Sequence, residues 1–142
     1  MTHRIPVLTL SVVIVSLLLI GLVSGTIVRH TIQIVPGTLA LAALLRGREW
    51  GVSAALPIFA FWLFIVILIW LFLLGIARIA RGHFSPAEIV LTVAIGVACF
   101  WGLIGSGLGR IGWPARVAAM AFFLGLQIAT MWLSVQPSFA RR

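Results

Sequence analysis

The chain lacks lysine, aspartate and tyrosine, and Glu49 and Glu88 are the only acidic residues among its 142. Both acids flank long apolar runs, so no carboxylate lies at mid-membrane depth, where pumps and secondary transporters place ionisable groups. A single cysteine, Cys99, cannot form a disulfide framework. The sequence also has no closely spaced Cys, His and carboxylate ligands for zinc and no nucleophile-elbow motif. We therefore predict no metal, no cofactor and no catalytic residue.

All ten basic residues are arginines, and the formal net charge is +8. They occur singly or in pairs between apolar segments, and no basic run is present that could follow a phosphate backbone. Arginines placed in this way anchor helix ends at lipid head groups. We therefore expect a lipid bilayer around the protein and no nucleic-acid partner.

The longest apolar run extends from Trp50 to Ala77 and contains no charged residue. As a helix it would reach roughly 42 Å, more than the ~30 Å hydrocarbon core of a bilayer. The whole chain is 63% hydrophobic and 8% charged, with a mean hydropathy of +1.26. A soluble domain carries about 25% charged residues. The composition indicates an integral membrane protein.

We predict one transmembrane domain over residues 1–142, an all-α helical bundle of four membrane-spanning helices plus one short segment interrupted by proline. The predicted segments cover about 5–28, 31–45, 54–77, 86–108 and 115–136. The second segment holds Pro36 and Gly37 and would give only about 22 Å of helix. It is either a fifth span, with a turn at residues 24–26, or a re-entrant or tilted half-helix. We favour the fifth span.

The positive-inside rule does not orient the protein, because four or five spans both place five arginines on each side. The use of arginine without lysine is a feature of GC-rich genomes. On this basis we expect the protein in a bacterial inner membrane.

Small residues recur at intervals of four and predict close helix–helix packing. They are Gly21 and Gly25 in the first segment, Ala94, Ala98, Gly102 and Ser106 in the fourth, Gly105 and Gly109 beside these four, and Ala121, Gly125 and Ala129 in the last segment. We expect the strip on the last helix to face the strip on the helix before it. The spacing does not indicate whether other partners are helices of this chain or of another one.

The sequence Ser85-Pro86-Ala87-Glu88 predicts a helix start. Serine at the N-cap and glutamate three residues later form a capping box, and proline suits the first helical position. This assigns a structural role to Glu88.

The main polar group within the apolar segments is Arg29, His30, Thr31 and Gln33, with Gln127 alone in the last helix. We predict Arg29, His30, Gln33 and Gln127 as ligand-binding candidates, for a lipid head group or a quinone, with His30 also a candidate haem ligand. The alternative is a polar helix junction that satisfies a broken backbone. Five spans place His30 and His83 on the same side, but their spacing does not indicate a haem-binding pair.

Three functions remain open from the sequence. The first is a non-catalytic accessory or anchor subunit that packs against other membrane helices, in a hetero-complex or homo-oligomer. The second is a small homo-oligomeric carrier or channel built around Gln127 and the cluster Arg29–Gln33. The third is a lipid-, quinone- or haem-binding membrane protein.

Overall fold

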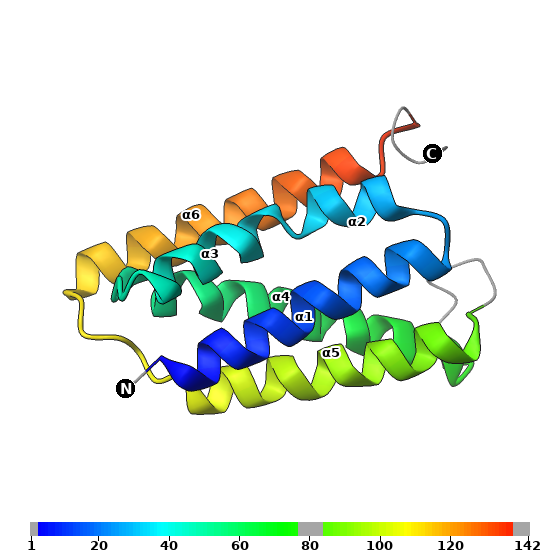
Figure 1. The fold of residues 1–142 in the computed structure, drawn as a ribbon, viewed down its shortest axis with the longest axis horizontal. Helices are drawn as coiled ribbons and strands as arrows, with labels where there is room; N and C mark the ends of the chain where they lie inside the picture. Colours follow the sequence, from blue (N-terminus) through cyan, green and yellow to red (C-terminus); the bar gives the residue numbers. More distant parts are fainter. Residues whose placement is uncertain (1–2, 77–83, 138–142) are drawn as a thin grey trace.

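The computed structural model describes residues 3–76 and 84–137, and all regular secondary structure in these ranges is helical (Figure 1). The helices are α1 (Arg4–Val23), α2 (Ile27–Gln33), α3 (Val35–Leu45), α4 (Trp50–Leu73), α5 (Pro86–Gly105) and α6 (Trp113–Ser134). Four of them, α1, α4, α5 and α6, are long and apolar enough to cross a membrane. The predicted all-α bundle with four spans and a broken fifth segment is confirmed.

The short segment is a pair of helices, α2 and α3, bent by 48° at their junction. Figure 1 shows α2 beginning where α1 ends and α3 ending where α4 begins, so the pair runs from one end of the bundle to the other. A single broken span would follow this course along the bundle. The five passes alternate in direction along the bundle.

Pro36 explains the break between α2 and α3. It has no backbone N–H to donate to the carbonyl of Ile32, and its ring would clash with that carbonyl in a continuous helix. Helix α2 therefore ends before Ile34, which keeps a helical φ of −82° and ψ of −9°, and α3 begins at Val35 with Pro36 in its first turn. Proline is favoured in the first turn of a helix, where its missing N–H costs nothing, and Pro36 occupies that position in α3.

The helix boundaries differ from the predicted ones by up to five residues, at both N-terminal and C-terminal ends. The first helix stops at Val23 rather than near residue 28, because Gly25 adopts a left-handed conformation with φ of 69°. The N–H of Thr26 then donates to the carbonyl of Gly21 over 2.8 Å, as in a Schellman turn. The predicted early turn at residues 24–26 is present, and Gly25 is a turn residue outside the helix. Gly21 instead allows α2 to approach α1 closely, because an added Cβ at Gly21 would lie 3.0 Å from Ile27 Cα.

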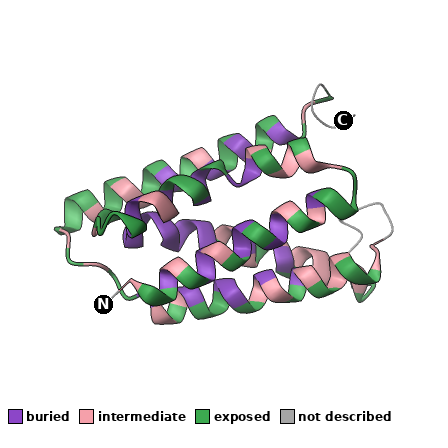
Figure 2. Cartoon of the chain, viewed as in Figure 1, coloured by how far each residue is buried: buried purple, intermediate pink, exposed green. Residues whose placement is uncertain are grey.

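The first half of α4 forms the centre of the bundle, where every residue from Gly51 to Phe59 is buried. Helices α3, α5 and α6 all pack against α4, and α5 also packs along α1. Figure 2 shows the buried residues turned inward and the exposed residues on the outer faces. Many outer residues are large and apolar, such as Leu8, Val97 and Phe122, which is the arrangement expected of helices surrounded by lipid.

The small residues of α5 face the interior of this chain. Ala98, Gly102 and Ser106 are buried and Ala94 is half-buried. Gly102 lies against the ring of Phe59 on α4, with an added Cβ only 2.7 Å from ring carbons. Gly105 similarly lies against Ile5 of α1, where an added Cβ would be 2.8 Å from the side chain.

Two expectations about the small residues are wrong. Helix α5 ends at Gly105, so Gly109 lies in the following loop, with φ of 68°, and does not extend the helical strip. Among the described residues α6 makes no contact with α5 and packs on α2, α3 and α4 instead. The strip Ala121, Gly125 and Ala129 is exposed on the outer face of α6.

The capping box at the start of α5 has the predicted geometry. The amide of Glu88 donates to Ser85 Oγ over 3.3 Å, and Glu88 Oε2 accepts from the Ser85 amide over 2.7 Å. Oε2 also accepts from Ser85 Oγ–H over 2.8 Å. These bonds fix Glu88 near one end of the bundle.

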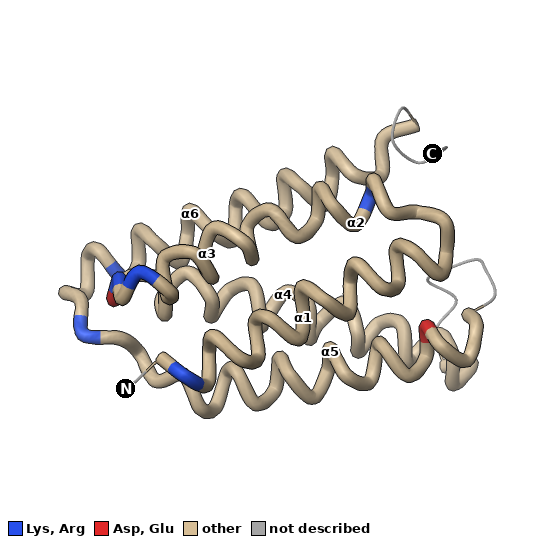
Figure 3. Tube along the Cα trace, viewed as in Figure 1, with Lys and Arg blue, Asp and Glu red and all other residues tan. Residues whose placement is uncertain are grey.

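Charged residues of the described part lie near the two ends of the bundle and not along its middle (Figure 3). One end carries Arg4, Arg46, Arg48, Glu49, Arg110 and Arg116. Arg29 and Glu88 lie toward the other end, although they belong to helices far apart in sequence. The apolar middle and charged ends match the depth profile of a bilayer.

Candidate functional site

A cavity of about 560 Å³ lies between α1, α2, α4, α5 and α6. It exists because α2 and α3 diverge: α3 packs on α4, whereas α2 contacts α1 and α6 but neither α4 nor α5. The 48° bend carries α2 away from the bundle centre, and the space left between α2 and the C-terminal half of α4 is the cavity. Its lining residues come from segments up to 114 positions apart, Leu17 to Met131.

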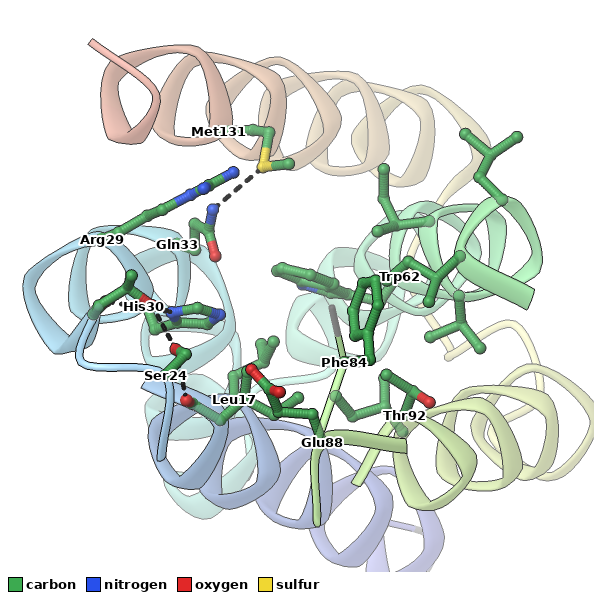
Figure 4. Close-up of a pocket in the computed structure, with 17 residues that line it drawn as sticks. Leu17, Ser24, Arg29, His30, Gln33, Trp62, Phe84, Glu88, Thr92 and Met131 are labelled. Atoms are coloured by element: carbon green, nitrogen blue, oxygen red, sulfur yellow. Dashed lines mark hydrogen bonds between the residues drawn. The ribbon is translucent and has the colours of Figure 1, made fainter. Parts of the chain in front are cut away.

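One wall of the cavity is apolar. Helix α4 contributes Trp62, Ile65, Val66, Leu68 and Ile69, and the other apolar lining residues are Leu17, Ile20, Phe84, Ile95 and Met131. Figure 4 shows the Trp62 and Phe84 rings at the centre of this space. Such a wall suits the hydrocarbon part of a ligand.

The polar lining residues gather toward one end of the bundle, from the α1–α2 turn, from α2 and from the start of α5. They are Ser24, Thr26, Arg29, His30, Gln33, Glu88 and Thr92. Figure 4 shows Arg29 directed toward Met131, whereas the Glu88 carboxylate lies on the same side of the cavity as Ser24 and His30. The predicted candidates Arg29, His30 and Gln33 therefore line one cavity.

A hydrogen-bond chain at the α1–α2 turn holds His30 in place. The Ser24 and Thr26 hydroxyls are 2.6 Å apart, and His30 Nδ1 lies 3.2 Å from Thr26 Oγ1 and 3.1 Å from its carbonyl oxygen. With Nδ1 engaged by Thr26, the Nε2 side of the imidazole ring is left to face the cavity (Figure 4).

Arg29 and Glu88 carry hydrogen-bonding capacity that the described part of the protein leaves unused. Arg29 Nε is buried without a hydrogen-bond partner, and no ion pair joins Arg29 to Glu88. The hydrogen bonds of Glu88 to Ser85 all use Oε2, and Oε1 accepts none within the described residues. An unpartnered buried nitrogen such as Arg29 Nε favours a bound partner.

Gln33 and Gln127 lie together between α2 and α6. Gln33 Nε2 donates to Ser134 Oγ over 2.9 Å, and Gln127 Nε2 donates to the backbone carbonyl of Gln33 over 3.3 Å. That carbonyl is near the break before Pro36, so Gln127 supports the broken backbone. Gln127 is completely buried within one chain and therefore does not line a path between copies, as the carrier hypothesis required.

Sequence reasoning missed the roles of Glu88, Trp62 and Thr92 in this cavity. The capping box accounted for Glu88, and the aromatic residues of α4 resembled ordinary packing residues. Five spans do place Arg29 and Glu88 on the same side of the membrane, so topology contained a signal for their proximity. The bend that opens the cavity toward both residues depends on long-range packing, which the sequence pattern does not specify.

A second cavity of about 320 Å³ lies at the opposite end of the bundle, beside His3, Glu49, Ser106 and Arg110. Glu49 Oε2 accepts from the Arg110 amide over 3.1 Å, and Glu49 Oε1 lies 3.5 Å from His3 Nε2. These contacts connect the start of α4 to the α5–α6 loop and to the N-terminal end of α1. Glu49 thus has structural partners at this end.

Residues 3–76 and 84–137 contain no group of three His, Cys, Asp or Glu side chains that could hold a metal ion. His83, considered with His30 as a haem-ligand pair, lies outside the described residues. Comparison of the chain with protein-family models, with curated proteins and with solved structures finds no match. The cavity geometry is therefore the basis for proposing a function.

Proposed function

We propose that this small helical membrane protein binds one membrane-soluble amphiphile in the cavity between α2 and α4. The observation that carries the proposal is the division of the cavity lining, with a continuous apolar wall on α4 and polar groups gathered toward one end of the bundle. This is the third hypothesis drawn from the sequence, in its lipid- or quinone-binding form.

The position of the polar groups supports an amphiphile that enters from the bilayer. Arg29 and Glu88 lie toward one end of the bundle, where lipid head groups would lie, with His30 next to Arg29 in sequence, and Trp62 lies near the middle of α4. A bilayer amphiphile has its own polar and apolar parts in the same order. Binding can then exchange lipid contacts for protein contacts without moving the head group into the hydrocarbon core, which would be costly.

Replacement of Arg29 by glutamine tests this proposal. The substitution removes the guanidinium from the rim, and the loss of a hydrogen bond from a charged group weakens binding by roughly 1.5–3 kcal/mol, or tenfold or more. Native mass spectrometry of the protein extracted in mild detergent should show one retained amphiphile on the unmodified chain and strongly reduced retention on Arg29→Gln.

Arg46→Gln is the matched control, because Arg46 is an exposed arginine at the other end of the bundle and outside the cavity. It should retain the amphiphile. Equal retention by both variants, or an unmodified chain with no bound mass, would contradict the proposal.

A second function, the accessory or anchor subunit, is favoured by the outer face of α6. Ala121, Gly125 and Ala129 are exposed there, and an added Cβ at Gly125 would meet no atom within 4 Å. A helix of another protein could approach this face closely. Residence in a bacterial inner membrane is part of both proposals and depends on arginine usage alone.

A further inference from the structure

The two charged residues of the cavity stand on different helices and do not neutralise each other. Arg29 is on α2 and Glu88 is on α5, and no contact joins these two helices. Within the described residues, His3 and Glu49 make an acid–base contact of 3.5 Å, and Arg29 and Glu88 make none with each other. The cavity therefore carries a cation on α2 and an anion on α5, and His30 lies within electrostatic range of both.

Local contacts leave both charges open to a ligand. Ser85 engages one oxygen of Glu88 and leaves Oε1 without a hydrogen-bond donor in the described part of the chain. Arg29 extends past Gln33 toward Met131, and neither of these side chains neutralises its charge. A charge away from bulk water gains most from a partner of opposite sign at hydrogen-bond distance.

Three kinds of head group differ in how well they would pair with the charges of Arg29 and Glu88. A neutral ring such as a quinone would leave both charges without a counter-charge. An anionic head group would pair with Arg29, but Glu88 would repel it across the cavity. A head group with an anion and an ammonium group would pair with both residues at once.

Building on the amphiphile-binding function, we infer that the ligand head group is zwitterionic, with its phosphate or carboxylate on Arg29 and its primary ammonium on Glu88. His30 lies beside Arg29 and is placed to contact the anionic part through Nε2. An ethanolamine phospholipid has this chemistry, and so does a free phosphoethanolamine ester. The apolar α4 wall distinguishes the two sources, because only the lipid has acyl chains to occupy it.

The test is a competition measured by native mass spectrometry. Delipidated full-length protein in mild detergent receives equal amounts of phosphatidylethanolamine and phosphatidylglycerol with identical acyl chains. We expect the unmodified protein to retain the ethanolamine lipid roughly tenfold or more over the anionic lipid, the factor expected for one hydrogen bond to a charged group. Glu88→Gln should bring this ratio close to one.

Glu88→Gln changes the charge with little effect on the fold, because glutamine also serves at the third position of a capping box. Ser85→Ala is the matched control: it weakens the box and keeps the carboxylate, so it should lower the melting temperature slightly and preserve the lipid preference. Arg29→Gln should weaken the binding of both lipids.

Equal retention of the two lipids by the unmodified protein, or a ratio that Glu88→Gln leaves unchanged, would overturn the zwitterion inference while amphiphile binding stands. Retention of neither lipid would also overturn the zwitterion inference, and the proposed function itself fails only if the unmodified chain extracted from its own membrane carries no bound amphiphile. Glycerophosphoethanolamine, which has no acyl chains, distinguishes the sources. If it displaces the bound lipid at equal concentration, the zwitterionic ligand is a free molecule, and if it does not, the ligand is a membrane lipid.

Discussion

Gly102→Leu is expected to destabilise the bundle more than any other single substitution considered for this chain. Even one added carbon at Gly102 would lie 2.7 Å from two ring carbons of Phe59, closer than nonbonded carbons approach. The Phe59 ring is completely buried at the centre of α4, so it has no free space to move into. Overpacking of this kind costs about 1–3 kcal/mol, or more when the backbone must shift. Thermal unfolding in detergent should show a melting temperature lower by several degrees.

Gly125→Leu on α6 is the matched control, because it introduces the same side chain at a position where nothing lies within 4 Å. It should leave the melting temperature unchanged. It also tests the accessory-subunit hypothesis, since a bulky side chain on this face should release any partner helix that packs there. The double variant Gly102→Leu with Phe59→Leu should recover part of the stability that Gly102→Leu loses. Equal melting temperatures for Gly102→Leu and Gly125→Leu would contradict the packing of α5 on α4.

Ile69→Trp is expected to reduce amphiphile binding strongly while the fold stays intact. Ile69 lines the cavity from α4 and carries no charge. A tryptophan at this position would occupy space that the ligand needs. Steric overlap of 1–3 kcal/mol corresponds to roughly a tenfold loss of affinity or more. The number of retained amphiphiles per chain, measured by native mass spectrometry, should fall accordingly.

Ile67→Trp gives the comparison for this variant. Ile67 is two positions away on the same helix, is 49% exposed and does not line the cavity. Its replacement by tryptophan adds the same bulk toward the lipid and should leave retention unchanged. If both variants retain the amphiphile equally, the cavity is not the place where it binds.

The spans and the helix break were predictable because they follow from local chemistry. Apolar runs of about 20 residues between arginines identify four helices, and Pro36 prevents a continuous helix through Ile32–Pro36. The turn at residues 24–26 contains Gly25, which reaches the left-handed conformation without strain. Each of these features depends on residues close together in the sequence.

The orientation of α6 was predicted incorrectly, because spacing identifies a face of small residues but not its partner. Gly125 and Gln127 lie about 200° apart around the helix axis, so only one of them can face inward. The buried face contains Phe123, Gln127, Thr130 and Ser134. The hydrogen bond from Gln127 to Gln33 removes an amide from lipid, and this gain exceeds what small residues obtain by packing.

The cavity was beyond prediction from the sequence, although three of its polar residues were identified. Its volume depends on the direction in which α2 leaves α3, and no local pattern sets the angle of that bend. Glu88 was assigned a capping role, which it has, and that role accounts for only one of its two carboxylate oxygens. A residue with one structural oxygen and one free oxygen can serve both the fold and a ligand.

The measurement that tests the central claim most directly is photo-crosslinking with a phospholipid that carries a diazirine early in its acyl chain. The purified protein is illuminated in detergent with this lipid, and the labelled peptides are mapped by mass spectrometry. The account predicts labels on the cavity residues of α4, between Trp62 and Ile69, and on Ile95 of α5, with both labels lost in Ile69→Trp. Labels confined to outward residues such as Phe122 and Ile128 of α6, unaffected by Ile69→Trp, would contradict it.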